Sequence, residues 1–137
     1  MKNIKRLRKI LGLTQAEFAK SLMVSRTTVT MWETENREPD YTMLSQIAEK
    51  YGVSTDFLIG CGLFSNWEEI MSHRKEILDK IATLAPEIKN ISQAADNELL
   101  LIRAFGALFK QITIQGEVIS LVLNPPFGFE VDSPSPH

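Results

Sequence analysis

The 137-residue sequence contains a single cysteine and two histidines, and it has no charge-free apolar run of the roughly 18 residues that a membrane helix needs. The lone Cys61 excludes a disulfide framework within the chain, and the few histidines predict no metal-ligand cluster. The sequence also lacks a glycine-rich phosphate loop and a recognisable spacing of nucleophile and base. We therefore expect neither an enzyme nor a cofactor. The basic start has no apolar signal region behind it, which predicts a cytoplasmic protein.

Charge is divided unevenly along the chain. Residues 1–60 carry nine basic and seven acidic side chains, a balance of +2, whereas the remaining residues carry six basic and ten acidic ones, a balance of −4. Together they give the formal net charge of −2. A nonspecific polycation is therefore not expected, and positive potential is concentrated in the amino-terminal part.

The apolar spacing of the first sixty residues predicts five short helices. Several residues that favour helix starts lie just before these apolar stretches, and the pair Thr14 and Glu17 has the full capping-box spacing. Glycines that adopt the left-handed conformation are expected to end helices. The expected starting residues are Thr14, Ser25, Asp40 and Ser54, and the expected terminating glycines are Gly12 and Gly52.

Residues 11–39, LGLTQAEFAKSLMVSRTTVTMWETENREP, are the most informative part of the chain. They predict two short amphipathic helices joined by a tight turn. In the second of these helices, Val29 and Trp32 point toward the core at i and i+3, so the other face points outward. An outward polar face on such a helix suits insertion into a DNA major groove. The outward residues are Arg26, Thr27, Thr30 and Met31.

This segment resembles the helix-turn-helix of the lambda-repressor-like family, also called the xenobiotic-response-element or Cro-type family, over about residues 3–60. The resemblance implies a transcriptional regulator that binds double-stranded DNA through residues 1–62. It implies that Gln15 contacts a phosphate and braces the recognition helix. It also implies that Arg26, Thr27 and Met31 face bases and that Thr28 faces a phosphate. The full expected DNA-binding set is Gln15, Ser25, Arg26, Thr27, Thr28, Thr30, Met31 and Arg37.

The chemistry of these residues supports part of the assignment. Arginine pairs bidentately with guanine, which is worth about 1–3 kcal/mol of discrimination, and threonine and methionine offer methyl contacts to thymine. Two positions depart from the family pattern, because Met23 and Glu35 stand where glycine is usual. A non-glycine residue with positive φ costs on the order of 1 kcal/mol, so we expect the local backbone to differ there.

The second part of the chain shows no family resemblance. Its apolar spacing predicts a helix-packing seam that Pro86 interrupts, as two helices meeting near Ala85 or as one kinked helix. A further helix is expected over residues 96–111. The β-branched run 112–123 favours a strand or hairpin, with a last helical turn as the alternative. Residues 124–137 are expected to form a flexible tail rich in proline and serine. The seam residues are Ile70, Arg74, Ile77, Ile81, Leu84, Ile88 and Ile91.

The fold class is therefore expected to be mainly α, with a five-helix DNA-binding domain and a small helical second segment. The helix at 96–111 is apolar on nearly all sides, so residues 63–123 are predicted to form an oligomerisation or sensor segment. A homodimer is the simplest expectation, because it reads two half-sites about 34 Å apart on a palindromic operator. An antagonist protein or a small ligand remains an alternative partner. The expected function is repression of transcription. The alternative is an antitoxin-like protein whose second segment binds a partner while the helix-turn-helix controls its own operon.

Overall fold

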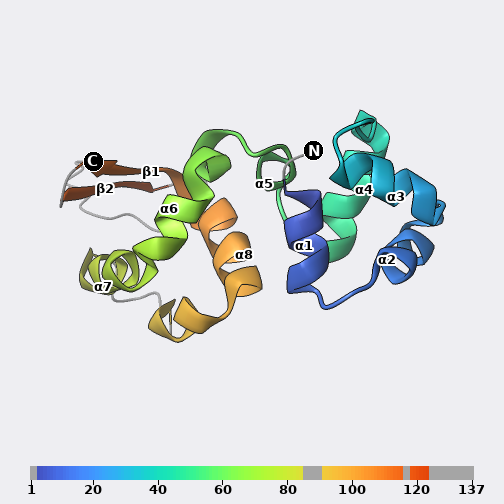
Figure 1. The fold of residues 1–137 in the computed structure, drawn as a ribbon. Coiled ribbons are helices and arrows are strands. Elements are labelled where there is room, and N and C mark those ends of the chain that lie inside the picture. The colour runs from blue at the N-terminus through green and yellow to red at the C-terminus, as the bar shows by residue number, and fades with distance from the viewer. Residues whose placement is uncertain (1–2, 85–90, 116–117, 124–137) are drawn as a thin grey trace, which may run out of the picture. The chain divides into compact units, whose positions relative to one another are not determined.

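The structure is a computed structural model that describes residues 3–84, 91–115 and 118–123 (Figure 1). The chain divides into two compact units, Met1–Ser65 and Asn66–His137. The expected domain limit at residue 62 is followed by a 3-10 turn, η1 (Gly62–Asn66), in which Phe64 is buried. The ring of Phe64 packs edge-on against Phe57, with centroids 5.4 Å apart. This contact keeps the turn with the first unit.

The described part of the first unit is built from five α-helices, as the apolar spacing predicted. Four of them begin at the expected capping residue, whose side chain accepts a hydrogen bond from a backbone N–H in the first turn. Thr14 and Glu17 form the predicted capping box. The helices are α1 (Ile4–Ile10), α2 (Gln15–Leu22), α3 (Arg26–Glu33), α4 (Tyr41–Tyr51) and α5 (Thr55–Ile59).

The core of the first unit takes one apolar face from each helix. Phe18 from α2, Val29 from α3 and Phe57 from α5 have no exposed surface. The buried Asn3 is the polar member of this core, and its side chain donates a hydrogen bond of 2.8 Å to the carbonyl of Phe57. That carbonyl lies near the end of α5, where the helix offers few N–H partners of its own. Asn3 therefore joins the first helix to the last.

Two residues of the first unit hold a backbone conformation that usually needs glycine. Met23 has φ 60° at the end of α2, and Glu35 has φ 61° after α3. Both stand where the family pattern has glycine, and both keep the left-handed conformation although the side chain is larger. The expectation that the local backbone would differ at these two positions is therefore wrong. Each costs on the order of 1 kcal/mol relative to glycine. The predicted glycines Gly12 and Gly52 are also left-handed.

The second unit begins with α6 (Trp67–Ser72) and α7 (Arg74–Leu84), which are separated at His73. This break was not predicted from the sequence. At the break, the Ser72 hydroxyl donates to the carbonyl of Glu69, and Nδ1 of His73 lies 3.0 Å from the same oxygen. Side chains that bond to a nearby carbonyl in this way compete with the helix ladder. The junction expected near Ala85 and Pro86 lies outside the described residues.

The seam predicted for this unit is confirmed where its side chains are described. Ile70, Ile77 and Ile81 are buried, and Arg74 is half-buried between them. The Nε of Arg74 donates to the carbonyl of Ala95 in the 3-10 helix η2 (Ile91–Asp96) over 2.6 Å. The contact ties η2 to the start of α7.

A tryptophan links the start of the second unit to its last helix, α8 (Glu98–Leu108). Trp67 packs edge-on against Phe105, with ring centroids 5.8 Å apart, and its Nε1 donates to Glu98 over 2.8 Å. Helix α8 is shorter than the predicted helix 96–111 at both ends. Its start is fixed by Asn97, whose Oδ1 accepts from the N–H of Leu100. Its end is followed at once by the strand that begins at Phe109, and the β-branched residues from Ile112 onward favour this extended chain.

The chain after α8 forms an antiparallel hairpin of β1 (Phe109–Gln115) and β2 (Val118–Leu123). Ile114 pairs with Ile119, and the register is irregular between Phe109 and Gln111. The hairpin interpretation of residues 112–123 is therefore correct, and the alternative of a last helical turn is wrong. The fold is mainly α with this one short hairpin in the described part, as expected. The predicted tail, 124–137, lies outside the described residues.

Candidate nucleic-acid interface

The turn between α2 and α3 sets the direction of the recognition helix. Leu22 closes the buried face of α2, Met23 reverses the chain with positive φ, and Ser25 begins α3. Figure 1 shows these two helices as consecutive short segments in the first unit. Because Val29 and Trp32 are buried, the opposite side of α3 is presented to solvent.

The presented side of α3 carries the residues predicted to face DNA. Arg26 and Thr27 are exposed, and Met31 one turn later is 38% exposed. Thr28 and Thr30 are half-buried. The hydroxyl of Thr30 donates to the carbonyl of Arg26 over 3.1 Å, so it stiffens the first turn of α3. The structure thus brings a charged, a hydroxyl-bearing and an apolar side chain together on one accessible surface.

Ser25 combines its predicted place beside this surface with a local structural role. Its Oγ accepts from the backbone N–H of Thr28 over 3.1 Å and lies 2.8 Å from the Thr28 hydroxyl. The first of these bonds occupies one backbone amide in the first turn of α3, that of Thr28. The remaining free amides at this helix start favour an anionic group such as a phosphate.

Gln15, the first residue of α2, lies at the centre of a hydrogen-bond network with α3. Its Nε2 donates to Glu33 over 3.1 Å. Its Oε1 accepts from the Nε of Arg26 over 3.4 Å and lies 3.3 Å from the hydroxyl of Thr30, whose single hydrogen is shared with the carbonyl of Arg26. The amide therefore contacts both ends of α3. This is the bracing that the family resemblance implied for Gln15.

An ion pair between α1 and α3 completes the network, and the sequence reasoning missed it. Arg8 donates from Nε and from one terminal nitrogen to the two carboxylate oxygens of Glu33, over 2.5 and 3.0 Å. The Glu33 side chain is only 3% exposed and that of Arg8 is 12% exposed. Arg8 also donates to the carbonyl of Leu13 over 2.9 Å. The pair fixes the spacing between α1, the start of α2 and the end of α3.

The electrostatics of Glu33 follow from these contacts. Burial acts to raise the pKa of the Glu33 carboxyl. The hydrogen bonds from Arg8 and Gln15, with the positive charges of Arg8 and Lys5, outweigh burial and hold the pKa below its ordinary value of 4.5. Glu33 is therefore ionised at neutral pH. The hydrogen bond to Glu33 also raises the pKa of Arg8.

Comparison with known proteins agrees with this geometry. The helix-turn-helix family matches residues 4–58, which cover α1 to α4 and most of α5. The chain is 33% identical over 86 residues to the HTH-type transcriptional regulator ImmR of Bacillus subtilis, a match that spans 63% of this chain and 68% of ImmR. The chain belongs to the lambda-repressor-like helix-turn-helix family of transcriptional regulators.

A second relative matches a shorter part of this regulator. It is the uncharacterized HTH-type transcriptional regulator YqaE of Bacillus subtilis, which is 40% identical over 57 residues. That match covers 42% of this chain and 49% of YqaE. No solved structure matches the chain. The regulator thus has a helix-turn-helix DNA-binding domain in its first unit, and membership of this family implies that it binds DNA.

The loop after α3 places the last predicted site residue of the regulator. Arg37 is exposed, and its backbone N–H donates to the carbonyl of Met31 over 3.3 Å. The left-handed Glu35 makes this return of the chain possible. Arg37 is therefore held beside the end of the exposed α3 surface.

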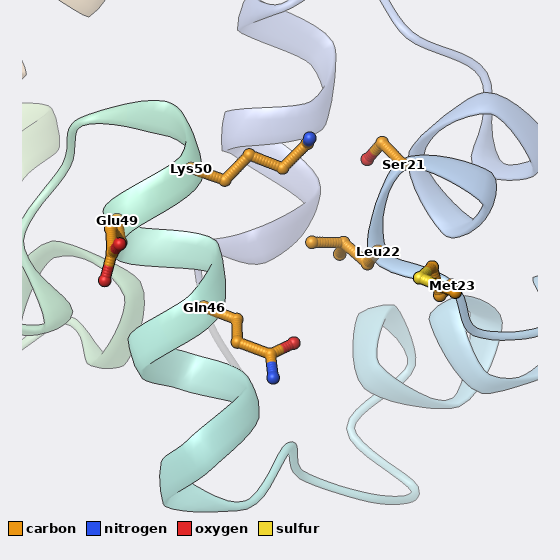
Figure 2. Close-up of a pocket in the computed structure, with 6 residues that line it drawn as sticks. All are labelled: Ser21, Leu22, Met23, Gln46, Glu49 and Lys50. Carbon is orange, nitrogen blue, oxygen red and sulfur yellow. The ribbon is translucent and has the colours of Figure 1, made fainter.

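A separate open groove of about 370 Å³ lies between the end of α2 and the second half of α4. Figure 2 shows Gln46 and Lys50 extending from α4 toward the α2 end, which carries Ser21 and Met23. None of the predicted DNA-facing residues lines this groove.

Within the described residues no group of histidine, cysteine and carboxylate side chains is placed to hold a metal ion. No helix in the described ranges is long and apolar enough to cross a membrane.

Proposed function

We propose that this regulator is a dimeric repressor that binds a palindromic operator with the first half of α3 in the major groove. The observation that carries the proposal is the exposed side of α3, where Arg26, Thr27 and Met31 stand clear of the buried side. A helix of this kind enters the groove with its amino-terminal residues against the base edges. The proposal includes no cofactor and no catalytic step.

Each expected site residue has a proposed role in this complex. Arg26 pairs through its two terminal nitrogens with O6 and N7 of a guanine, while its Nε stays on Gln15. Thr27 and Met31 place methyl groups against thymine. Gln15 and Thr28 contact phosphates at the starts of α2 and α3, where backbone amides favour an anion. The supporting positions are Ser25 and Thr30, which hold the first turn of α3, and Arg37, which contacts the backbone from the loop.

We place the dimer contact within residues 63–123. Leu100 on α8 is an apolar side chain that is 47% exposed, although Leu101 and Phe105 on the same helix are fully buried. A monomer reads only a few base pairs, whereas a twofold dimer sums the binding energies of two half-sites. Repression follows when such a dimer occupies promoter DNA.

The test of the proposed function is a selection from random duplex DNA with the full chain, repeated at low and at high salt. We expect an inverted repeat to be enriched at both salt concentrations, because base readout adds to phosphate attraction. Binding that shows no sequence preference and disappears at the higher salt would contradict base readout. A reporter gene downstream of the enriched site separates repression from activation.

The guanine contact is tested with Arg26→Ala. We expect the preference for one guanine per half-site to fall by a factor corresponding to about 1–3 kcal/mol, with little change at other positions. The matched control is Lys20→Ala, which removes an exposed positive charge from α2 outside the predicted site. An unchanged base preference in Arg26→Ala sinks this role.

The dimer contact is tested with Leu100→Glu. A buried, unpaired charge at a dimer contact is costly, so we expect sedimentation to show a shift from dimer to monomer and operator binding to weaken. The control variant, Ala82→Glu, introduces the same charge at an exposed position of α7. Equal sedimentation of the two variants as dimers would remove Leu100 from the interface.

A further inference from the structure

Glu33 does not belong to the predicted DNA-facing set, yet it is linked by hydrogen bonds to a residue that does. Its carboxylate accepts from Arg8 on one side and from Gln15 on the other. Gln15 in turn accepts from Arg26 and Thr30. The link therefore runs from the last residue of α3, through the first residue of α2, to the first residue of α3.

We propose that Glu33 is a positioning residue for base readout, because it fixes the orientation of the Gln15 amide and through it the side chain of Arg26. This inference rests on the proposed function of the α3 surface. Glu33 itself is excluded from touching DNA, since its side chain is only 3% exposed.

The polarity of the Gln15 amide determines which of its ends faces Arg26. An amide group has an oxygen that accepts and a nitrogen that donates, and the two ends have almost the same shape. A carboxylate only accepts hydrogen bonds, so the ionised Glu33 selects the orientation with Nε2 toward itself. The acceptor oxygen of Gln15 must then face Arg26. In the opposite orientation two donors meet, the amide of Gln15 and the Nε–H of Arg26.

Arg8 stabilises the form of Glu33 that selects this orientation of the Gln15 amide. It donates to both carboxylate oxygens, so Glu33 stays ionised and is held in one rotamer. The Nε of Arg26 is thereby engaged before DNA arrives, and its two terminal nitrogens are the pair that reads guanine. A side chain that is already ordered loses less entropy on binding, so the correct base is bound more tightly than with a mobile arginine.

Glu33→Gln tests the proposal because it keeps the size of the side chain and removes one acceptor. The N–H groups of Arg8 take the single remaining oxygen, and the new amide nitrogen turns toward Gln15. The Gln15 oxygen then faces position 33 and leaves Arg26 without an acceptor. We expect the preference for guanine over the other bases to fall about tenfold, within the range that one bidentate contact provides.

A swapped pair, Gln15→Glu with Glu33→Gln, supplies the rescue. The carboxylate at position 15 accepts from Arg26, Thr30 and the amide at position 33, and the amide oxygen at position 33 accepts from Arg8. We expect guanine preference to return, while overall affinity falls because a negative charge now lies beside the DNA phosphates. Ala16→Glu, at an exposed neighbouring position, is the control for the charge alone and should lower affinity without changing base preference.

A second readout uses the free protein, so it does not depend on DNA binding. NMR relaxation of the Arg26 Nε–H group should report an ordered side chain in the parent chain and in the swapped pair, and a mobile one in Glu33→Gln. Gln15→Ala leaves the pair of Arg8 and Glu33 intact and should mobilise Arg26 to the same extent. This variant keeps the test valid if Glu33→Gln fails to fold.

The outcomes separate this inference from the proposed function. If the Arg26 Nε–H group stays equally ordered in all variants, the positioning role is overturned, whatever base preference the variants show. Guanine preference that survives Glu33→Gln, while Arg26→Ala loses it, also overturns the positioning role and leaves the proposed function standing. Failure of the parent chain to prefer any sequence overturns the proposed function and the readout role of Glu33 with it, whereas the ordering of the Arg26 side chain by Glu33 is judged separately from the NMR relaxation.

Discussion

The two units of this regulator define their helices by different means. In the first unit, α2 to α5 each begin at a residue whose side chain caps the helix, and glycines with positive φ follow three of the five helices. In the second unit, α6 begins at Asn66 without a side-chain cap, and it ends at His73 without a glycine. Helix α8 of the second unit is capped by Asn97, whereas α6 is held by long-range contacts such as Trp67 with Phe105.

This difference explains which helix limits can be predicted from a few neighbouring residues. A cap or a terminating glycine acts within one helical turn, so its signal lies in four or five neighbouring residues. A contact between residues far apart in the chain leaves no such local pattern. The start of α6, which has no side-chain cap bond, therefore depends on packing that only the folded chain displays.

The largest effects should come from the two cores, which test whether the units unfold separately. Phe57 and Phe105 are both fully buried, one in each unit. Phe→Ala in a core costs about 3–5 kcal/mol. We expect calorimetry to show two transitions, of which Phe57→Ala lowers one and Phe105→Ala lowers the other. A single transition that both variants lower equally would contradict the division.

The next effect compares ion pairs in the two units. Arg8→Met leaves the buried Glu33 without its cation, so we expect a loss of about 3 kcal/mol from the first unit at neutral pH. The exposed Asp96 pairs with Arg74 at 3.9 Å in the second unit. Asp96→Asn should therefore cost less than about 1 kcal/mol. Denaturant unfolding measures the change in the free energy of unfolding for both variants. Similar losses would show that burial does not make the ion pair of Arg8 and Glu33 stronger than that of Arg74 and Asp96.

The stabilisation from the ion pair of Arg8 and Glu33 should also depend on pH. The folded-state pKa of Glu33 lies below its ordinary value of 4.5, so its ion pair stabilises the parent chain fully above that pH. The stabilisation is lost as the pH falls through the folded-state pKa. The parent and Arg8→Met should thus converge in stability in strong acid.

Helix starts provide a smaller test. Thr14→Ala removes a complete capping box and should cost about 1 kcal/mol. Asn66→Ala changes the start of α6, where the side chain makes no cap bond, and should stay within about 0.5 kcal/mol of the parent. Thermal unfolding of the two variants gives the answer, and a larger loss at Asn66 would reverse the contrast.

The smallest expected change is a gain. Met23 is 93% exposed and has positive φ, so its side chain contributes strain and little packing. Met23→Gly should stabilise the first unit by at most about 1 kcal/mol, because relief of strain exceeds the added freedom of the unfolded chain. Its DNA preference should not change. A loss of stability would mean that Met23 makes contacts that offset its conformation.

Much of the first unit could be predicted from the sequence, and particular residues show why. Thr14, Ser25, Asp40 and Ser54 act on adjacent amides, and Val29 and Trp32 repeat at helical spacing. The exposed side of α3 follows directly from that spacing. Its exposure is confirmed, while the individual DNA contacts remain proposals.

The ion pair of Arg8 and Glu33 could not be predicted in the same way. The two residues are 25 positions apart, and each looks like an ordinary charge on the polar face of its helix. The break at His73 and the early end of α8 were missed for a different reason. A helical apolar pattern continues through both points, but the local competition for backbone hydrogen bonds and the β-branched residues prevail.

The buried bond from Asn3 to Phe57 has a consequence for the dynamics of the first unit. It joins residues 54 positions apart, near the two ends of this unit, so neither α1 nor α5 can fray without breaking the same hydrogen bond. Terminal helices normally open locally and exchange their amide hydrogens quickly. Here the amides of α1 and α5 should exchange at the slow rate of the central helices, through cooperative opening of the whole unit.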